Sequence, residues 1–318
     1  ANGPVRVDSG LSGTASITSA DGFGNIFVTR LFTSANSLAT LNSLMRNPEN
    51  HYLNLHTRTH PGGAVRAQMR APDATTPQIV DIISGVSDPT LRTGGNGGLV
   101  TVFGRNLFKG PGDLGGFASP SAPIALNGTD VSIGGGAAPI VMMGRDPLGN
   151  PSDYIVVQVP FETAAGSQPV VVRNSNGAGA PFSITVAASA PGIFFDSEGG
   201  IVFRVLGLSL SEVALIRRGS PARANDTLAI VVTGVGNTSP ALVTGAFTPG
   251  DREYTVSGVT VTIGGRTVTP LTTAAIPGFL GLQVVVFTMP SGITGTTTTI
   301  EVTTSSGARS NRVTIPIA

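Results

Sequence analysis

The stretch DYIVVQVPFETAAGSQPVVVRNSNGAGAPFSITV, residues 153–186, decides the fold because a second copy of it follows later in the chain. It predicts three short strands separated by turn residues. Adding 130 to each number gives the second copy, as three pairs show: Pro160 and Pro290, Val170 and Ile300, Gly177 and Gly307. Upstream, the same offset relates Gly134 to Gly264 and Gly104 to Gly234. We therefore predict that residues 97–187 and 227–318 are two copies of one module.

Glycine and proline punctuate the chain, with 43 and 23 of them among 318 residues, which favours short strands and turns over helices. Strands are expected near residues 99–103, 129–133, 138–143, 153–159, 168–173 and 181–187. Such a series within about a hundred residues is typical of an immunoglobulin-like β-sandwich. The predicted fold class is all-β: a β-rich portion with one short helix at residues 1–70, then tandem sandwiches at residues 71–188 and 189–318.

Charge and composition exclude several classes of partner. Charged residues make up 12% of the chain and the formal net charge is +1, so no long-range field attracts it to nucleic acid or to an anionic membrane. The low charge, with a mean hydropathy of +0.25, gives little electrostatic protection against self-association. Cysteine is absent, which excludes disulfides and thiolate metal sites. No apolar run approaches the roughly 18 residues that a membrane span needs.

The first seventy residues have a different pattern from the repeats. Residues 24–31 are a strand candidate, and from Ser34 to Met45 the apolar residues recur at helical spacing, which predicts one helix. Residues 50–70 then predict a strand, a Pro-Gly-Gly turn and a second strand. The small residue Ala1 at the start is what removal of a signal peptide leaves, and trimming of a longer chain leaves the same.

Residues 50–70 resemble the end of the CHRD domain, a β-rich extracellular module found in secreted bacterial proteins. The resemblance rests on Tyr52, Asn54, His56, Thr57, Pro61, Gly62, Gly63, Arg66 and Gln68. Ala1 to Val7 looks like the middle of that domain, so its front half is missing. Either the chain is cut here, or the missing strands come from a neighbouring subunit that completes the open sheet edge.

Residues 77–318 resemble the Ig-like (IPT/TIG-related) modules that occur in tandem in large exported bacterial proteins. The motifs are turn and core positions, such as PFETAAGSQPVVV from Pro160 and VTVTIGG from Val259. The resemblance implies fold and export but no chemistry. Two further segments are assigned here: residues 104–126 as a surface loop, and residues 189–226 as a junction whose apolar side chains, including Ile193, Phe195 and Val202, hold the sandwiches together.

The three histidines, His51, His56 and His60, lie within ten residues of one another and are the weak candidates for a metal site. On an extended strand His51 and His56 face opposite ways. The alternative is a histidine that forms a hydrogen bond to the Pro-Gly-Gly turn.

No catalytic residues and no cofactor are assigned. A serine nucleophile needs a base within reach, and all three histidines lie in the first seventy residues. The scattered carboxylates are interpreted as solvated loop residues: Asp153, Glu162, Asp196, Glu198, Asp251 and Glu253. Asn174, Asn176 and Gly177 suggest calcium less well than an Asn-Gly hairpin turn. Asn127, Asn225 and Asn237 begin sequons to which no role is given.

These observations favour a non-enzymatic extracellular structural protein of a bacterium, a self-assembling cell-surface subunit joined through strand edges and apolar patches. Its partners are then identical subunits. The alternative is a monomeric adhesin or carbohydrate- or matrix-binding module, whose contact surfaces are the loops at residues 104–126 and 239–256. An enzyme is the least favoured class.

Overall fold

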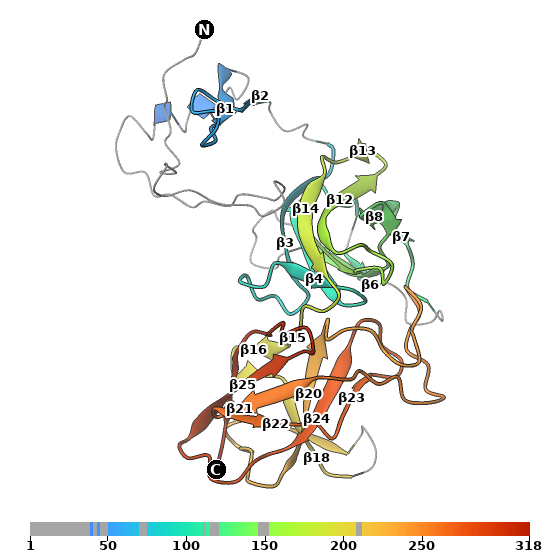
Figure 1. The fold of residues 1–318 in the computed structure, drawn as a ribbon. Helices are drawn as coiled ribbons and strands as arrows, with labels where there is room; N and C mark the ends of the chain where they lie inside the picture. Colours follow the sequence, from blue (N-terminus) through green and yellow to red (C-terminus); the bar gives the residue numbers. More distant parts are fainter. Residues whose placement is uncertain are drawn as a thin grey trace. The chain divides into compact units, whose positions relative to one another are not determined.

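The computed structural model describes residues 39–40, 43–44, 50–69, 75–110, 112–114, 121–145, 153–207 and 212–318 (Figure 1). The chain divides into two compact units, residues 1–75 and 76–318, and each is described by itself. The described part is almost entirely β-structure, so the all-β fold class is confirmed.

The first unit contains an antiparallel hairpin of β1 (Tyr52–Leu55) and β2 (Val65–Gln68). The predicted strand, Pro-Gly-Gly turn and strand are therefore confirmed. Of the predicted helix, Ala39, Thr40, Ser43 and Leu44 are helical, and the rest lies outside the described residues. So do the candidate strand at residues 24–31 and the segment from Ala1 to Val7.

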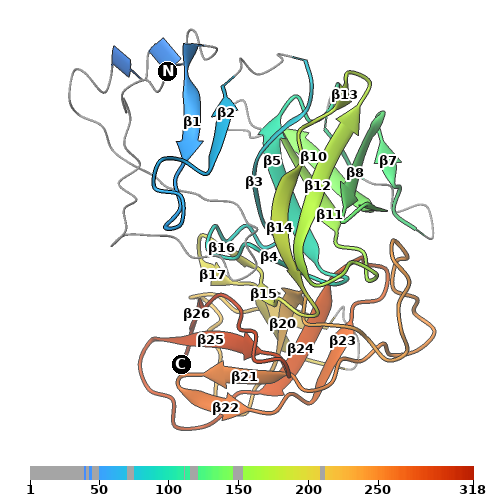
Figure 2. The ribbon, with the colours of Figure 1, turned by 45° about the horizontal axis from the view of Figure 1, so that its top comes forward.

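The second unit begins with sandwich 1, which has two sheets (Figures 1 and 2). Sheet A has the order β3 (Gln78–Ser84), β5 (Leu99–Arg105), β11 (Asp153–Gln158), β10 (Ile140–Arg145), β6 (Asp113–Leu114). Sheet B has the order β4 (Thr93–Gly95), β14 (Phe182–Ala187), β12 (Gly166–Asn174), β8 (Thr129–Ile133), β7 (Ala125–Leu126). Two short strands are attached to sheet B: β9 (Gly136–Ala137) and β13 (Gly177–Ala178).

Sandwich 2 follows with the same architecture. Sheet C has the order β19 (Val213–Leu215), β18 (Val202–Val205), β20 (Thr227–Thr233), β24 (Gln283–Thr288), β23 (Thr272–Ala275), with β15 (Gly192–Ile193) also on β20. Sheet D has the order β22 (Arg266–Val268), β21 (Thr260–Ile263), β25 (Thr297–Thr303), β26 (Val313–Pro316). A small hairpin joins β16 (Phe195–Asp196) to β17 (Gly199–Gly200).

Each core forms because alternate residues of facing strands are apolar and point inward. In sandwich 1, Val100 and Val157 of sheet A are buried in one cluster with Val131 and Val172 of sheet B. In sandwich 2 the cluster includes Leu228 and Phe287 of sheet C and Val261 and Ile300 of sheet D. Burial of each such side chain contributes about 1.5–3 kcal/mol.

The strand registers repeat between the sandwiches with one exception. Val170 pairs with Ile133 as Ile300 pairs with Ile263, an offset of 130 in both strands. The exception is the pair of strands β5 and β20. Ile155 on β11 pairs with Val102 on β5, and Val285 on β24 pairs with Ile230 on β20. The offset is therefore 130 between β11 and β24 but only 128 between β5 and β20.

The predicted equivalence of Gly104 and Gly234 is therefore wrong. The residue that corresponds to Gly104 is Val232, because Asp153 pairs with Gly104 as Gln283 pairs with Val232. The two glycines serve different purposes. A Cβ on Gly104 would lie 2.1 Å from the carbonyl oxygen of Gln78 on the neighbouring strand, whereas Gly234 follows its strand with a φ of +71°.

The assignment of residues 104–126 to a surface loop is wrong at both ends. Leu107 and Phe108 are 0% and 3% exposed and belong to the core of sandwich 1. β6 and β7, within the same segment, pair with β10 and β8. The polar and glycine-rich composition concealed this apolar pair, which closes the end of the core.

The predicted junction at residues 189–226 is wrong for most of its length, because β15, β18 and β19 belong to sheet C of sandwich 2, and only its first residues, such as Ala190, lie at the contact with sandwich 1. Ile193 and Val202 lie in the core of that sandwich, and Phe195 is 40% exposed. β18 pairs with β20 as β3 pairs with β5. The repeated unit therefore begins one strand earlier than the sequence similarity indicated.

Candidate functional site

The histidines do not form a metal site among the described residues. The Nδ1 of His56 donates to the carbonyl oxygen of Pro61 at 2.7 Å, and its Nε2 accepts from the Nδ2 of Asn54 at 3.0 Å. Both ring nitrogens are thus occupied, and the alternative of a histidine bound to the Pro-Gly-Gly turn is confirmed for His56. His60 contacts Thr59, and His51 contacts Ser43. Within the described ranges no three histidine, aspartate or glutamate side chains gather.

Asp153 corrects the interpretation of the carboxylates as solvated loop residues. It is buried, and its Oδ2 accepts the backbone N–H of Leu107 at 2.9 Å. Its Oδ1 accepts from the Nε of Arg145 at 3.2 Å. Asp153 therefore anchors the buried start of the 104–126 segment to the start of β11.

The other candidate carboxylates that bind a side chain bind threonine or arginine, as Glu162 does with Thr244, and two of them share one arginine. Arg217 binds both Asp196 and Glu198. Arg252 forms a hydrogen bond that holds the pKa of Asp251 below its usual range, and both side chains are exposed. The Asn-Gly turn is confirmed, because the Oδ1 of Asn174 accepts the N–H of Asn176 at 2.8 Å beside Gly177.

The two sandwiches contact each other directly through their backbones. A Cβ on Gly98 would lie 2.7 Å from the Cα of Gly234. A Cβ on Gly95 would lie 2.7 Å from the backbone nitrogen of Ala190 and 2.9 Å from the oxygen of Gly234. Only residues without side chains permit this approach. We call this contact the glycine junction. It comprises Gly95, Gly97, Gly98, Leu99 and Gln158 on one side and Ala190, Thr233, Gly234, Gly245 and Gly281 on the other.

Buried hydrogen bonds cross the glycine junction. The N–H of Leu99 donates to the Oγ1 of Thr233 at 2.8 Å, and that hydroxyl donates to the carbonyl oxygen of Gly281 at 2.7 Å. Gln158 is 2% exposed. Its Nε2 donates to the oxygen of Gly97 in its own sandwich at 3.1 Å, and its Oε1 accepts the N–H of Gly245 from the other at 2.8 Å. Because each bond fixes a separate point, the sandwiches cannot rotate freely.

The two loops predicted as contact surfaces are joined to each other in this junction. Ser121 and Ala246 form an antiparallel bridge, and the N–H of Ala122 donates to the oxygen of Gly245 at 2.8 Å. Thr244 also donates to the carboxylate of Glu162 at 2.6 Å. These parts of the loops are therefore not free for a ligand. Sequence reasoning missed the junction, although the run from Gly94 to Gly98 was its visible signal.

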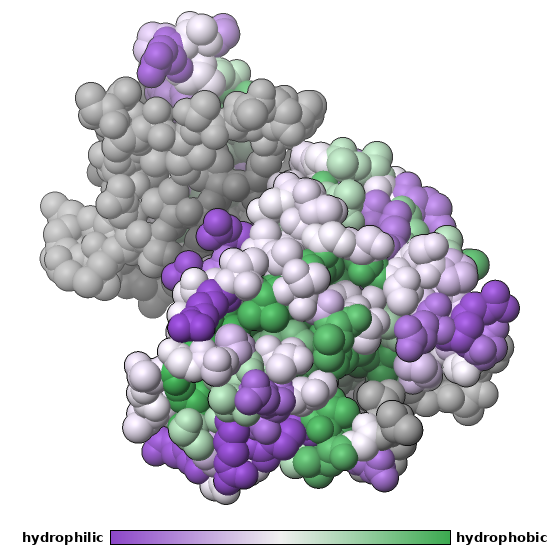
Figure 3. Space-filling view, turned by 60° about the horizontal axis from the view of Figure 1, so that its bottom comes forward, coloured by the Kyte–Doolittle hydropathy of each residue, from purple (hydrophilic) through white to green (hydrophobic). Residues whose placement is uncertain are grey.

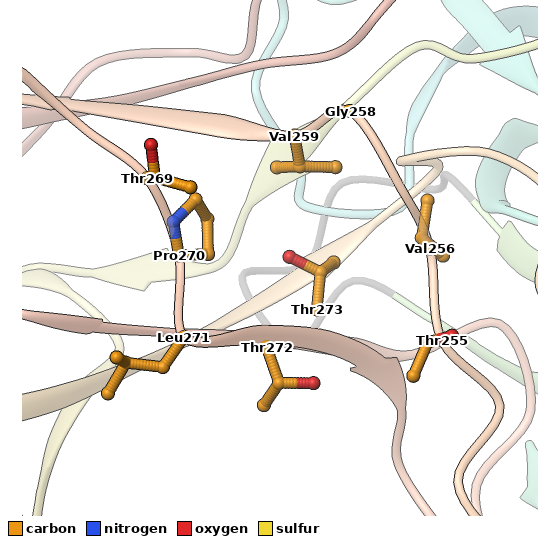
Figure 4. Close-up of a pocket in the computed structure, with 9 residues that line it drawn as sticks. All are labelled: Thr255, Val256, Gly258, Val259, Thr269, Pro270, Leu271, Thr272 and Thr273. Carbon is orange, nitrogen blue, oxygen red and sulfur yellow. The ribbon is translucent and has the colours of Figure 1, made fainter.

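A hollow of about 260 Å³ lies in sandwich 2 between the segments 255–259 and 269–273 (Figure 4). Val259 and Thr273 point towards each other at its centre, while Leu271 points away. The residues that line it offer hydroxyl and methyl groups, with no ionisable side chain among them. Its lining therefore supplies no ionisable general acid or base that could activate the threonine hydroxyls.

Comparison with known proteins establishes no family. No family model and no curated protein matches this chain. A surface glycan-binding protein of Bacteroides ovatus (SGBP-B, in complex with a mixed-linkage heptasaccharide) aligns at 14% identity and a TM-score of 0.29, over 71% of this chain and 43% of its own. SGBP-B of a xyloglucan utilization locus in Bacteroides uniformis aligns at 16% identity and a TM-score of 0.21, over 76% of this chain and 48% of its own. The adhesin InvE of Yersinia pseudotuberculosis aligns at 13% identity and a TM-score of 0.20, over 78% of this chain and 61% of its own.

The chain thus spans less than two thirds of the length of each of these structures. TM-scores of this size establish no common fold for the whole chain. Within the described residues, no helix is long and apolar enough to cross a membrane.

Proposed function

We propose that this chain is a non-enzymatic structural protein of the outside of a bacterial cell, a subunit that associates with copies of itself. The observation that carries the proposal is the glycine junction. Interfaces between neighbouring domains are usually polar and permit relative motion. Here backbone meets backbone at Gly98 and Gly234, and buried hydrogen bonds tie both sides. Two sandwiches joined in this way act as one rigid body, which is suited to a subunit of an ordered assembly.

Composition supports the same proposal. A net charge of +1 over 318 residues leaves little repulsion between copies. The resemblance of residues 52–68 to the CHRD domain and of residues 77–318 to exported Ig-like modules supports an extracellular location. The CHRD-like hairpin belongs in this proposal to a domain that another part of the chain or a neighbouring subunit completes.

Light scattering and electron microscopy of the whole chain over a wide range of concentrations test this function. We expect the average mass to rise with concentration and ordered assemblies to form. A chain that stays monomeric at every concentration contradicts the proposal.

The alternative function, a carbohydrate-binding or adhesin module, has one specific observation in its favour. Phe279 is 44% exposed, and its backbone is bonded to Thr248 in the loop that also carries Asp251 and Tyr254. An exposed aromatic ring is suited to stacking against a sugar, and the carboxylate and phenol of the bonded loop are suited to hydrogen bonding with one. A glycan screen with F279A, and with F195A as the control at an equally exposed phenylalanine, tests this alternative. Binding that F279A alone removes favours it over the structural role.

A further inference from the structure

The ends of the two-sandwich body determine where another copy can attach. Gly95, Gly97 and Gly98 form the turn that receives sandwich 2, with Gly98 N–H donating to Gly95 O at 2.9 Å and Gly97 N–H donating to Val159 O at 2.9 Å. Sandwich 2 has the same turn at its far end. There Asp226 N–H donates to Arg223 O at 3.1 Å and Asn225 N–H donates to Met289 O at 2.9 Å.

The residues of the second turn differ in a decisive way. Gly97 and Asn225 share a positive φ, +72° and +67°, but Arg223 and Asp226 replace the glycines whose missing Cβ atoms admit a neighbour. Asp226 also accepts from the Nε of Arg204 at 2.7 Å. The far end of sandwich 2 is therefore closed by side chains and by an ion pair. Terminal repeats of this kind end an array, so a third sandwich cannot attach by the same geometry.

A further copy therefore cannot extend the body at this end by the same contact, whereas the outer face of sheet C is more apolar than the solvated face of a sheet usually is. A sheet with one buried face normally carries polar residues on the other. The outward positions in the middle of the face are Phe203, Leu215, Ala229, Val231, Val284 and Val286, all apolar and all except Ala229 partly exposed. The face also carries polar threonines towards its margins: Thr227 and Thr288, which pair with each other, and Thr272 on β23.

The outer face of sheet D, on the same sandwich, shows the ordinary pattern. Its outward positions include Thr262, Thr267, Thr299, Glu301 and Thr314. Both faces belong to the same sandwich, so the overall composition of the chain does not explain why one is apolar and the other polar. Figure 3 shows hydrophobic side chains gathered into patches on one side of the molecule, among weakly polar and charged ones. A contiguous set of apolar outward residues, such as that of sheet C, is the kind of surface that marks a contact with another molecule.

Size and charge indicate what that surface is. The five strands of sheet C on one path span about 19 Å across, from spacings of about 4.8 Å, and β20 is about 20 Å long. The footprint is about 400 Å² per copy, or about 800 Å² per pair, which corresponds to a weak and reversible contact. An uncharged face meets its own copy without repulsion, as a twofold contact requires.

We propose that the outer face of sheet C is the surface through which two copies of this chain pack face to face. This inference rests on the proposed self-association and names its surface. The edge strand β19, with the uncharged sequence Val213–Leu215, continues the same apolar face to its rim.

Sedimentation equilibrium of the whole chain tests the proposal with V284K, a change at the centre of the face, and with T262K as the control on the face of sheet D. We expect V284K to weaken association by about tenfold or more, because two like charges meet across the twofold contact, and T262K to leave it unchanged. Mixing V284K with V284E is expected to restore association, which shows that a loss is not caused by misfolding.

The outcomes separate this inference from the proposed function. If the wild-type chain associates and V284K associates equally well, another surface is responsible and the inference is wrong while the proposed function stands. If the wild-type chain is monomeric throughout, both are wrong. If the monomer binds a polysaccharide and V284K abolishes that binding while T262K does not, the face binds a partner other than a second copy, and the inference is also wrong.

Discussion

Replacing Gly98 with alanine should disturb the contact between the sandwiches without straining the backbone locally. Gly98 lacks a positive φ, so alanine is conformationally acceptable there. Its Cβ would nevertheless lie 2.7 Å from the Cα of Gly234, 2.9 Å from the nitrogen of Gly234 and 3.1 Å from the oxygen of Gly95. All three are backbone atoms, which cannot rotate away as a side chain does. The two sandwiches must therefore move apart.

The magnitude follows from two opposing effects. Overpacking of a well-packed contact costs about 1–3 kcal/mol, and the lower entropy of the unfolded chain returns about 0.4–1 kcal/mol. The free energy of unfolding should thus fall by about 1–2 kcal/mol, and each 1 kcal/mol corresponds to about 2–4 °C in the melting temperature. Separation of the sandwiches should also broaden or split the transition of residues 76–318.

Differential scanning calorimetry measures both effects, with G136A as a matched control. Gly136 also lacks a positive φ. A Cβ added to it would lie 3.6 Å from the carbonyl oxygen of Ile133, which is an ordinary contact distance. We expect G136A to melt like the wild type in one transition. If G98A does the same, the glycine junction is not a rigid contact and the reasoning from it is refuted.

Two further substitutions test buried polar groups, and a zinc titration tests the exposed His56. T233V removes the acceptor of Leu99 N–H and the donor to Gly281 O, so we expect a loss of about 1–3 kcal/mol in urea denaturation; an unchanged midpoint would show that water replaces the hydroxyl. N311A removes the buried side chain that binds both backbone groups of Ile193, at a similar cost of about 1–3 kcal/mol, whereas N237A at an exposed site should be neutral. Because both ring nitrogens of His56 are already bonded, neither Zn²⁺ nor a chelator should shift the melting temperature, and a zinc-dependent rise would contradict the structural role of the histidines.

The strands of the two sandwiches were predictable because their core positions alternate with outward ones, as Ile155 and Val157 do on β11. That pattern depends only on local chemistry. The offset on β20 was not predictable, because LVTVFG and LAIVVTG match equally well in more than one alignment, and only pairing with Gln283 fixes the register.

The glycine junction and the true start of sandwich 2 depend on contacts that no local pattern reports. Glycine serves both tight turns and close backbone approach, and a single sequence does not distinguish these uses at Gly95 and Gly98. Thr233 bonds to Leu99 across 134 residues. The apolar residues of the segment 189–226 were recognised as buried, but their partner strands decide whether they face a core or a neighbour.

Rigidity of the two-sandwich body is measured most directly by the distance between spin labels placed on each sandwich. The chain contains no cysteine, so T185C on β14 and T314C on β26, both exposed strand positions, accept labels specifically. We expect one narrow distance distribution in the wild-type background and a broader one with G98A added. A broad distribution in the wild-type background would mean that the sandwiches move independently, and the proposal of a rigid structural subunit would fail.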